Sequence, residues 1–450
     1  MSQGDVMGVA EVVGRIGVID AFPTVDELYA FADRLAAAHP SRVRISELGR
    51  SRGGDPIRAV RVGSGGHNIL VFGNPHPNEP IGLATIRHLL GRLAAPESDC
   101  LGATWHFVLC VDPDGTRLNE EWYAGPLTRT AVARHFYRPP AAEQPEWCFP
   151  TTWRGTAVGV PLPETEALMA LIDRTEPALI ASLHNAEFGG GFFYTTGGDP
   201  GYWSALTALL DAAGLPLHRG EPDSPGARVW APGVFELPPF GQMADVLAAA
   251  GVEPVAALGG GGSRDYSARF GSALLVSELP LWIDPRVTDR TPGDRSLAAV
   301  LAATAADYRE TATVVAAVLH RLEGELSGRS PFERAVRAVL GNIPGLAAAK
   351  EALGRERPAT LGEIFVEKYV WTGMLRLRVG GMLSRLLAAE AGRSPLVAAE
   401  RDRFAEVFAQ WCAAIDTSAP GCRVPIDRLV AVQAAAVVLA AGRVRAGLPV

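Results

Sequence analysis

A histidine and a glutamate lie three residues apart at the end of an apolar segment. The segment covers residues 67–73, His76 and Glu79 follow it, and a helical pattern over residues 81–93 comes next. At a corner between a strand and a helix, both side chains can reach the same metal ion. Neutral imidazole and carboxylate suit zinc, and a catalytic zinc site has three protein ligands. A hydrolytic site would therefore need a third ligand and a base from elsewhere in the chain.

Short apolar runs alternate with helical patterns along the first two thirds of the chain. Continuous apolar runs indicate strands that are buried on both faces, so we predict an α/β fold with a mixed, largely parallel sheet sandwiched by helices. The runs cover residues 69–72, 104–111, 178–183 and 273–277. Helices are expected over residues 24–39, 81–93, 163–173, 203–213 and 241–250, and a hairpin over residues 43–48 and 57–62.

Polar residues directly after the buried strands are the strongest candidates for chemistry, because ligands of open α/β sheets bind beyond the carboxyl ends of the strands. Besides His76 and Glu79, this filter selects Arg117, His184 and Glu278. Together they supply three metal ligands, a general base and a positive group for a developing oxyanion. Glu187 also follows His184 by three residues, but a glycine-rich segment comes after it, so Glu79 is preferred as the ligand.

Composition narrows the class of protein. The 450 residues carry a formal net charge of −7 and their basic residues are scattered, so we expect no nucleic-acid partner. The N-terminal residues lack a basic head followed by an uninterrupted apolar stretch, and we expect neither a secretory signal nor a membrane span. The five cysteines are widely spaced and odd in number, which favours a reduced, cytoplasmic protein.

The last third of the chain differs in character from the rest. Residues 297–326 and 424–446 are alanine-rich with a helical period, and no strand pattern is evident beyond residue 290. We predict a catalytic domain over residues 1–290 and an all-α region over residues 291–450. Two roles remain open for this region, namely covering the catalytic domain and forming an oligomer interface.

The selected residues resemble the zinc carboxypeptidase (metallocarboxypeptidase) family over about residues 20 to 285. His76 and Glu79 match its His-x-x-Glu motif, and His184 matches the later histidine. The remaining matches are the Asp-Pro-Asp-Gly and Arg-Leu-Asn segments at residues 112–119, the Gly-Gly-Ser-Arg-Asp-Tyr segment at 261–266 that leads to Glu278, and an early hairpin at 49–57.

The resemblance implies one Zn²⁺ per chain, held by His76, Glu79 and His184. It also implies that Glu278 takes a proton from water and returns it to the leaving amine, and that Arg117 stabilises the oxyanion. The His₂Glu ligand set is the set of carboxypeptidase A.

The resemblance further implies substrate contacts after the second buried run, at Asn119 and at Tyr137-Arg138. The family has an Asn-Arg pair where this chain has Tyr137-Arg138; Arg138 retains the ability to bind a carboxylate through two hydrogen bonds. Arg264 aligns with a position lining the side-chain pocket, where a cation would favour an acidic substrate residue. A solvent-facing loop arginine is the equally weighted alternative for Arg264.

Three functions are compatible with these residues. The leading one is zinc-dependent, carboxypeptidase-like hydrolysis of a peptide bond in short cytoplasmic peptides, with a preference for acidic side chains as an added expectation. The alternative is an N-acyl-amino-acid amidohydrolase of the aspartoacylase and succinylglutamate desuccinylase type, which shares Asn78 between the first two ligands. A non-catalytic peptide-binding scaffold is disfavoured, because the full ligand set and Glu278 are present.

Overall fold

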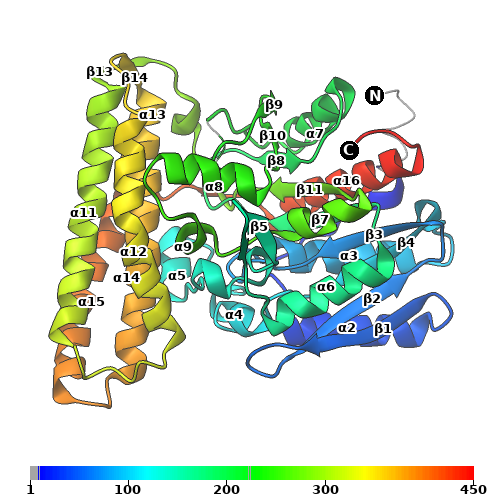
Figure 1. Cartoon of the computed structure of the whole chain (residues 1–450), viewed down its shortest axis with the longest axis horizontal. Coiled ribbons are helices and arrows are strands. Elements are labelled where there is room, and N and C mark those ends of the chain that lie inside the picture. The colour runs from blue at the N-terminus through cyan, green and yellow to red at the C-terminus, as the bar shows by residue number, and fades with distance from the viewer. Residues whose placement is uncertain (1–8, 10, 221, 223) are drawn as a thin grey trace.

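A mixed sheet of nine strands forms the centre of the computed structural model, which describes residues 9, 11–220, 222 and 224–450 (Figure 1). The strand order is β1-β2-β4-β3-β7-β11-β8-β10-β9. The strands are β1 Val43–Arg50, β2 Pro56–Val62, β3 His67–Phe72, β4 Ala103–Val108, β7 Leu179–His184, β8 Phe192–Thr195, β9 Val229–Ala231, β10 Val234–Glu236 and β11 Ala273–Glu278. The mixed, largely parallel sheet expected from the sequence is confirmed.

The four central strands run parallel, in the order β4, β3, β7 and β11, and antiparallel strands join them on both sides. Side chains of β3 alternate between the two faces of the sheet. Ile69 and Val71 belong to the core that contains helix α3 (Ile81–Ala94), whereas Leu70 and Phe72 belong to the core that contains helix α6 (Pro163–Thr175). Burial on both faces explains why the sequence of this strand is continuously apolar.

Helices cover both faces of the sheet (Figure 1). The principal ones are α2 Val25–Ala38, α3 Ile81–Ala94, α6 Pro163–Thr175, α7 Pro200–Ala212 and α8 Phe240–Ala249. Each lies within a few residues of its predicted position. Helix α2 begins with the capping box expected of its sequence, in which Thr24 accepts from the Glu27 amide and the Glu27 side chain accepts from the Thr24 amide.

Shorter elements connect these layers. The helices among them are α4 Pro113–Arg117, α5 Arg129–Arg134, α9 Pro254–Leu258, α10 Ser263–Ser267, α13 Leu361–Phe365 and a π-helical stretch over Val366–Trp371. A small hairpin pairs β5 Thr151–Trp153 with β6 Thr156–Val158. Strands β8 to β10 escaped sequence prediction because each has only three or four residues, too few to show a period.

Four long helices form a separate bundle beside the sheet (Figure 1, left). They are α11 Leu297–Arg321, α12 Pro331–Ala352, α14 Thr372–Glu390 and α15 Pro395–Ser418. The core of the bundle includes Ala133 of α5 and, just after that helix, Phe136 and Tyr137. The bundle therefore covers part of the catalytic region, which is one of the two roles left open by the sequence; an oligomer interface stays a prediction.

Two features of the C-terminal third differ from the predicted all-α region. Short strands occur there, because β13 Pro292–Ser296 pairs with β14 Pro358–Thr360, and β15 Cys422–Arg423 pairs with β12 Trp282–Ile283. The last helix, α16 Ile426–Arg445, leaves the bundle and packs in the same core as α3 and α7. The predicted division at residue 290 therefore needs correction, because residues 424–441 belong to the core under the sheet.

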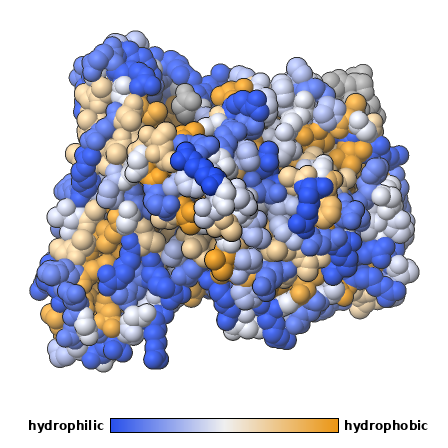
Figure 2. Space-filling model, in the orientation of Figure 1, coloured by the Kyte–Doolittle hydropathy of each residue, from blue (hydrophilic) through white to orange (hydrophobic). Residues whose placement is uncertain are grey.

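No described helix is long and apolar enough to cross a membrane. Apolar surface is visible along the bundle in Figure 2. A groove between α11 and α15 is lined by Val314, Val318 and Phe404 beside the charged residues Arg321 and Glu400.

Candidate metal centre

The loop between β3 and α3 has a backbone shape that presents His76 and Glu79 toward the neighbouring strands. It contains Asn74, a non-glycine residue with a φ of +48°. The side-chain nitrogen Nδ2 of Asn74 donates to Thr116 Oγ1 at 3.0 Å and to the hydroxyl oxygen of Tyr123 at 3.4 Å. The Tyr123 hydroxyl in turn donates to the carbonyl of Pro77. These bonds hold the loop on both sides of His76.

His76, Glu79 and His184 form a buried group whose potential ligand atoms all lie within 4.8 Å of one another. Each residue is 3–6 % exposed. Nδ1 of His76 is buried without a hydrogen-bond partner among the described residues, and Nδ1 of His184 lies 3.0 Å from Oε2 of Glu79. A buried nitrogen without a partner is costly in a folded protein, and a cation would remove that cost. Two imidazole nitrogens and a carboxylate fit zinc.

Burial and charge set the protonation of this group in opposite ways at the two histidines. Burial, assisted by the positive Arg138, holds the pKa of His76 well below its usual range. Burial also acts to lower the pKa of His184, but hydrogen bonds to Glu146 and Glu79 and the charge of Glu278 outweigh it and raise that pKa well above the usual value. His76 is therefore a neutral ligand, and a metal at His184 would displace a proton.

Glu146 and Ser182 contact the far side of the His184 ring. Nε2 of His184 lies 3.3 Å from Oε2 of Glu146 and 2.9 Å from the Ser182 hydroxyl, which donates to the same carboxylate. Ser263 donates to the other oxygen of Glu146 at 3.0 Å. A carboxylate behind a histidine fixes the ring orientation and its tautomer, so that the opposite nitrogen faces the metal. Glu146 was not predicted from the sequence, because it lies in a short 3-10 helix, Pro145–Trp147, and matches no motif.

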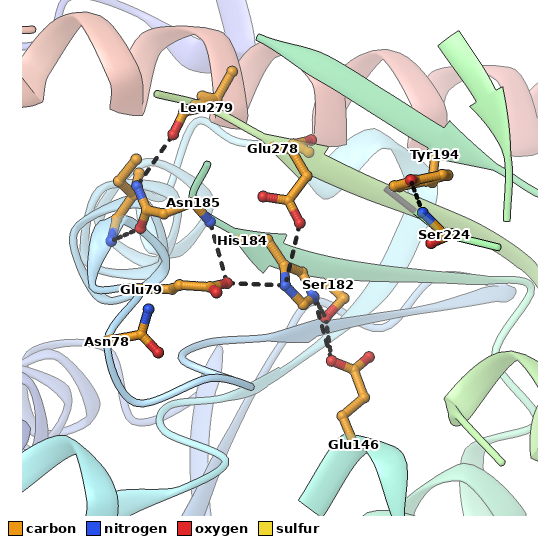
Figure 3. A network of polar contacts seen from close by, with 12 residues as sticks. Asn78, Glu79, Glu146, Ser182, His184, Asn185, Tyr194, Ser224, Glu278 and Leu279 are labelled. Atoms are coloured by element: carbon orange, nitrogen blue, oxygen red, sulfur yellow. Dashed lines mark hydrogen bonds and ion pairs between the residues drawn. The ribbon is translucent and has the colours of Figure 1, made fainter. Parts of the chain in front are cut away.

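Glu278 lies next to the metal ligands, as predicted. In the parallel pair β7 and β11 it is the register partner of His184, and its Oε1 is 3.6 Å from Nδ1 of His184. Figure 3 shows Glu79 and Glu278 approaching one side of the His184 ring while Glu146 lies on the other. The sheet thus brings the predicted base to the predicted metal site.

Arg138 is the arginine that contacts the ligand group. Its Nη1 lies 2.6 Å from Oε1 of Glu79 and 3.4 Å from the side-chain oxygen of Asn78, and its guanidinium lies over the ring of Trp147. Burial lowers the pKa of Arg138, and the negative charge of Glu79 opposes this change. A buried, positively charged group beside a metal ligand is suited to stabilising negative charge.

Arg117 contacts two carboxylates that do not belong to the ligand group. Its guanidinium donates to Asp55 at 2.6 Å and to Asp26 at 2.7 Å, and its side chain is 32 % exposed. Two carboxylates neutralise this arginine at the outer end of α4, where it ties the early hairpin to α2. These contacts tie Arg117 to Asp26 and Asp55, so its role at the oxyanion stays a prediction, whereas Arg138 is the arginine beside the ligand Glu79.

The other predicted substrate contacts have structural partners instead. The Asn119 side chain is buried and exchanges two hydrogen bonds with the backbone of Tyr137, at 2.9 and 3.0 Å. The Tyr137 ring packs edge-on against Phe332 in the bundle. Arg264 donates to the carbonyl of Leu237 at 3.2 Å. Glu187 binds arginines and not the ligand group, in agreement with the choice of Glu79.

Comparison with known proteins supports the residues assigned to the metal. A family model described as zinc carboxypeptidase (peptidase M14) matches residues 28–197. Zinc carboxypeptidase A 1 of Anopheles gambiae is 29% identical over 101 residues, which cover 21% of this chain and 23% of that protein. A zinc carboxypeptidase of Simulium vittatum is 31% identical over 101 residues, or 21% of this chain and 33% of that protein. The chain thus spans 23% to 33% of the length of these relatives.

Solved structures show a distant likeness. Carboxypeptidase A from Helicoverpa armigera aligns with a TM-score of 0.40 and 15% identity, covering 63% of this chain and 72% of that one. A metallo-carboxypeptidase from Burkholderia cenocepacia aligns with a TM-score of 0.34 and 17% identity, covering 73% of this chain and 68% of that one.

Proposed function

We propose that the chain hydrolyses peptide bonds with a zinc ion held by His76, Glu79 and His184, because residues 28–197 match the model of the zinc carboxypeptidase family. The observation that carries this proposal is that three buried side chains able to bind zinc lie next to a fourth that can act as a base. This fourth residue is Glu278, and its Oε1 lies 3.6 Å from Nδ1 of His184. A zinc ion there would act as a Lewis acid on the scissile carbonyl and on the attacking water.

The protein residues supply the proton transfer. The Glu278 carboxylate takes a proton from the attacking water and delivers it to the amine nitrogen as the C–N bond breaks. One carboxylate can do both because it lies on the side of the ligand group where Glu79 and His184 converge (Figure 3). Arg138 places positive charge beside the same group and stabilises the oxyanion that forms at the carbonyl.

Short peptides are the substrates that this site favours. The bundle contacts the segment after α5 that leads to Arg138, through packing on Phe136 and Tyr137 and a hydrogen bond from Arg385 to the carbonyl of His135. A cytoplasmic location is part of the proposal and rests on the spacing and odd number of the cysteines. A preference for acidic side chains is proposed through Arg264, and it would be lost in Arg264→Ala relative to uncharged substrates.

Purified protein should be assayed with dipeptides and tripeptides beside N-acyl amino acids. We expect peptide hydrolysis that a chelator abolishes and zinc restores, and a loss of about 10²- to 10⁴-fold in Glu278→Gln. Glu356→Gln, at an exposed position, is the matched control. Turnover of N-acyl amino acids alone would favour the amidohydrolase. Activity that persists in Glu278→Gln and in the presence of chelator would overturn the zinc mechanism.

A further inference from the structure

One buried side chain of the last helix is polar. Gln433 belongs to α16 and is 0 % exposed, whereas every other buried residue of α16 is apolar and belongs to the core under the sheet. A methionine there would fill about the same space without giving up hydrogen bonds to water. A fully buried amide needs hydrogen-bond partners inside the protein, and the position of those partners indicates its role.

The Gln433 amide joins two strand ends to a helix. Its Nε2 donates to the carbonyl of His184 at 3.1 Å and, in a weaker contact of 3.5 Å, to the carbonyl of Ser277. Its Oε1 accepts from the Thr85 hydroxyl at 2.7 Å. His184 ends β7, Ser277 precedes Glu278 at the end of β11, and Thr85 lies in α3. A carbonyl can only accept, so the amide nitrogen must face the strands and the oxygen must face Thr85.

The end of β7 has a partner strand on one side only. Pairing with β3 ends at Ser182, two residues before His184, whereas pairing with β11 continues to Glu278. Residues at the end of an element open more readily than those at its centre. At this end, side chains supply hydrogen bonds that a longer β3 would otherwise provide, and the bond from Gln433 to the carbonyl of His184 is one of them.

A second buried amide links the neighbouring segments of the metal centre. Oδ1 of Asn185 accepts from the amide of Ile81, the first residue of α3, at 3.0 Å, and its Nδ2 donates to the carbonyl of Leu279 at 3.4 Å (Figure 3). Ile81 follows the ligand Glu79 by two residues, and Leu279 follows Glu278. Asn185 thus connects the segments after β3, β7 and β11, while the amide of α16 connects the ends of β7 and β11 to α3.

We propose that Gln433 is a positioning residue of the metal centre, which holds the metal ligand His184 and the base Glu278 at their distance by bonding the last residues of β7 and β11. This inference rests on the proposed function. Gln433 acts through backbone carbonyls and touches neither the metal ligand atoms nor the carboxylate of the base. The last helix of the chain thereby takes part in a site whose metal ligands all lie within residues 28–197.

Replacing the amide by an apolar side chain of the same length tests the proposal. Gln433→Met removes all three hydrogen bonds and keeps the volume of the core. A displacement of His184 relative to Glu278 should lower kcat for a short peptide about 10- to 100-fold, with KM within about twofold. Zinc affinity, measured by competition with a fluorescent chelator, should fall about 10-fold. The visible absorption bands of the Co²⁺-loaded protein should shift, because they report the geometry of the ligands.

Other variants separate positioning from a general loss of stability. Thr85→Val retains Gln433 but removes the hydroxyl that orients its amide, so we expect part of the loss in kcat and zinc affinity. Thr85→Ser keeps the hydroxyl and should restore most of what Thr85→Val loses. Val437→Ala, about one helical turn after Gln433, opens a cavity in the same core and should lower the melting temperature without changing kcat or zinc affinity.

A folded Gln433→Met protein with the kcat and zinc affinity of the unmodified chain would overturn the proposal, as would equal losses in Val437→Ala. The melting temperature shows whether each variant is folded, and Thr85→Val decides by the same measurements if Gln433→Met is not. Reduced zinc affinity in the variants, without peptide hydrolysis by the unmodified chain, would refute the proposed function and keep the positioning role. Peptide hydrolysis with kcat and zinc affinity unchanged in the variants would do the reverse.

Discussion

Glu278 and His184 are register partners at the carboxyl ends of two parallel strands, with 3.6 Å between Oε1 and Nδ1. Their proximity is set by backbone pairing, because six consecutive residues of β11 pair in register with six of β7. A base on a paired strand is held more firmly than one on a loop. The distance between base and metal ligand is therefore a property of the sheet.

Shortening the base should separate catalysis from metal binding. Glu278→Asp withdraws the carboxylate by one methylene while the strand register stays the same. We expect kcat to fall about 10²-fold, because a displacement of this order in a reacting group has that effect. Zinc content, measured by atomic absorption after dialysis, should equal that of the unmodified chain. A parallel loss of zinc would place Glu278 among the ligands.

Removing the charge of Glu146 should weaken zinc binding without removing a ligand. In Glu146→Gln the amide no longer attracts the proton on Nε2 of His184, so the ring loses its preferred tautomer. We expect zinc affinity to fall about 10- to 100-fold, as measured by competition with a fluorescent chelator. Glu143→Gln, in the same loop but paired with Arg334 on the surface, should keep full affinity. Equal affinities in the two variants would contradict the positioning role of Glu146.

Replacing Arg138 and Arg117 separately by glutamine tests which of the two arginines stabilises the oxyanion. Arg138→Gln should lower kcat about 10²-fold, since it removes a buried positive charge bonded to Glu79 at 2.6 Å. Arg117→Gln should leave kcat nearly unchanged and lower stability only slightly, because its ion pairs with Asp26 and Asp55 are partly exposed. Steady-state kinetics and urea unfolding measure the two effects. The opposite ranking of kcat would restore the assignment made from sequence.

The sequence predicts the metal ligands because each follows a strongly apolar strand. His76, Glu79, His184 and Glu278 all come at or just after strands whose continuous apolar character marks them as central. The rule that parallel strands present their carboxyl ends at one edge then brings the four residues together. His184 and Glu278 are the last residues of their strands, whereas His76 and Glu79 also need the conformation of the loop between β3 and α3.

Sequence prediction fails where loops or distant helices decide the outcome. Arg117 and Arg138 lie on the same connection after β4, and only the fold of that connection shows that Asp26 and Asp55 bind the first. Glu146 lies in a 3-10 helix of three residues, which is too short to show a period in the sequence. The return of α16 to the core under the sheet also depends on long-range packing, which an alanine-rich pattern does not specify.

Asp112 should make the stability of the protein depend on pH. It lies directly after β4 and is 1 % exposed, and its Oδ2 has no hydrogen-bond partner among the described residues. Burial raises its pKa to about 7; the amide of Gly115 and the charge of Arg52 oppose the change, and Glu164 and Asp114 add to it.

The sign of the effect follows from the raised pKa of the folded state. The contribution of Asp112 is fully present below its unfolded pKa near 4 and is lost as the pH rises through about 7, because the buried carboxyl must then ionise. Asp112→Asn cannot ionise and can still accept from Gly115. As the pH rises from 4.5 to 8, we expect the free energy of unfolding of Asp112→Asn to increase relative to that of the unmodified chain, by about 3 kcal/mol.

Urea unfolding of Asp112→Asn and of the unmodified chain at pH 4.5 and at pH 8 gives the difference in unfolding free energy between the two proteins at each pH. The change in that difference reports Asp112, because the other titrating groups contribute equally to both proteins. Asp211→Asn, at an exposed position on α7, should show the same pH dependence as the unmodified chain. A difference between Asp112→Asn and the unmodified chain that stays constant from pH 4.5 to pH 8 would mean that Asp112 remains ionised in the folded protein. Its unpartnered oxygen would then need a cation other than Arg52 nearby.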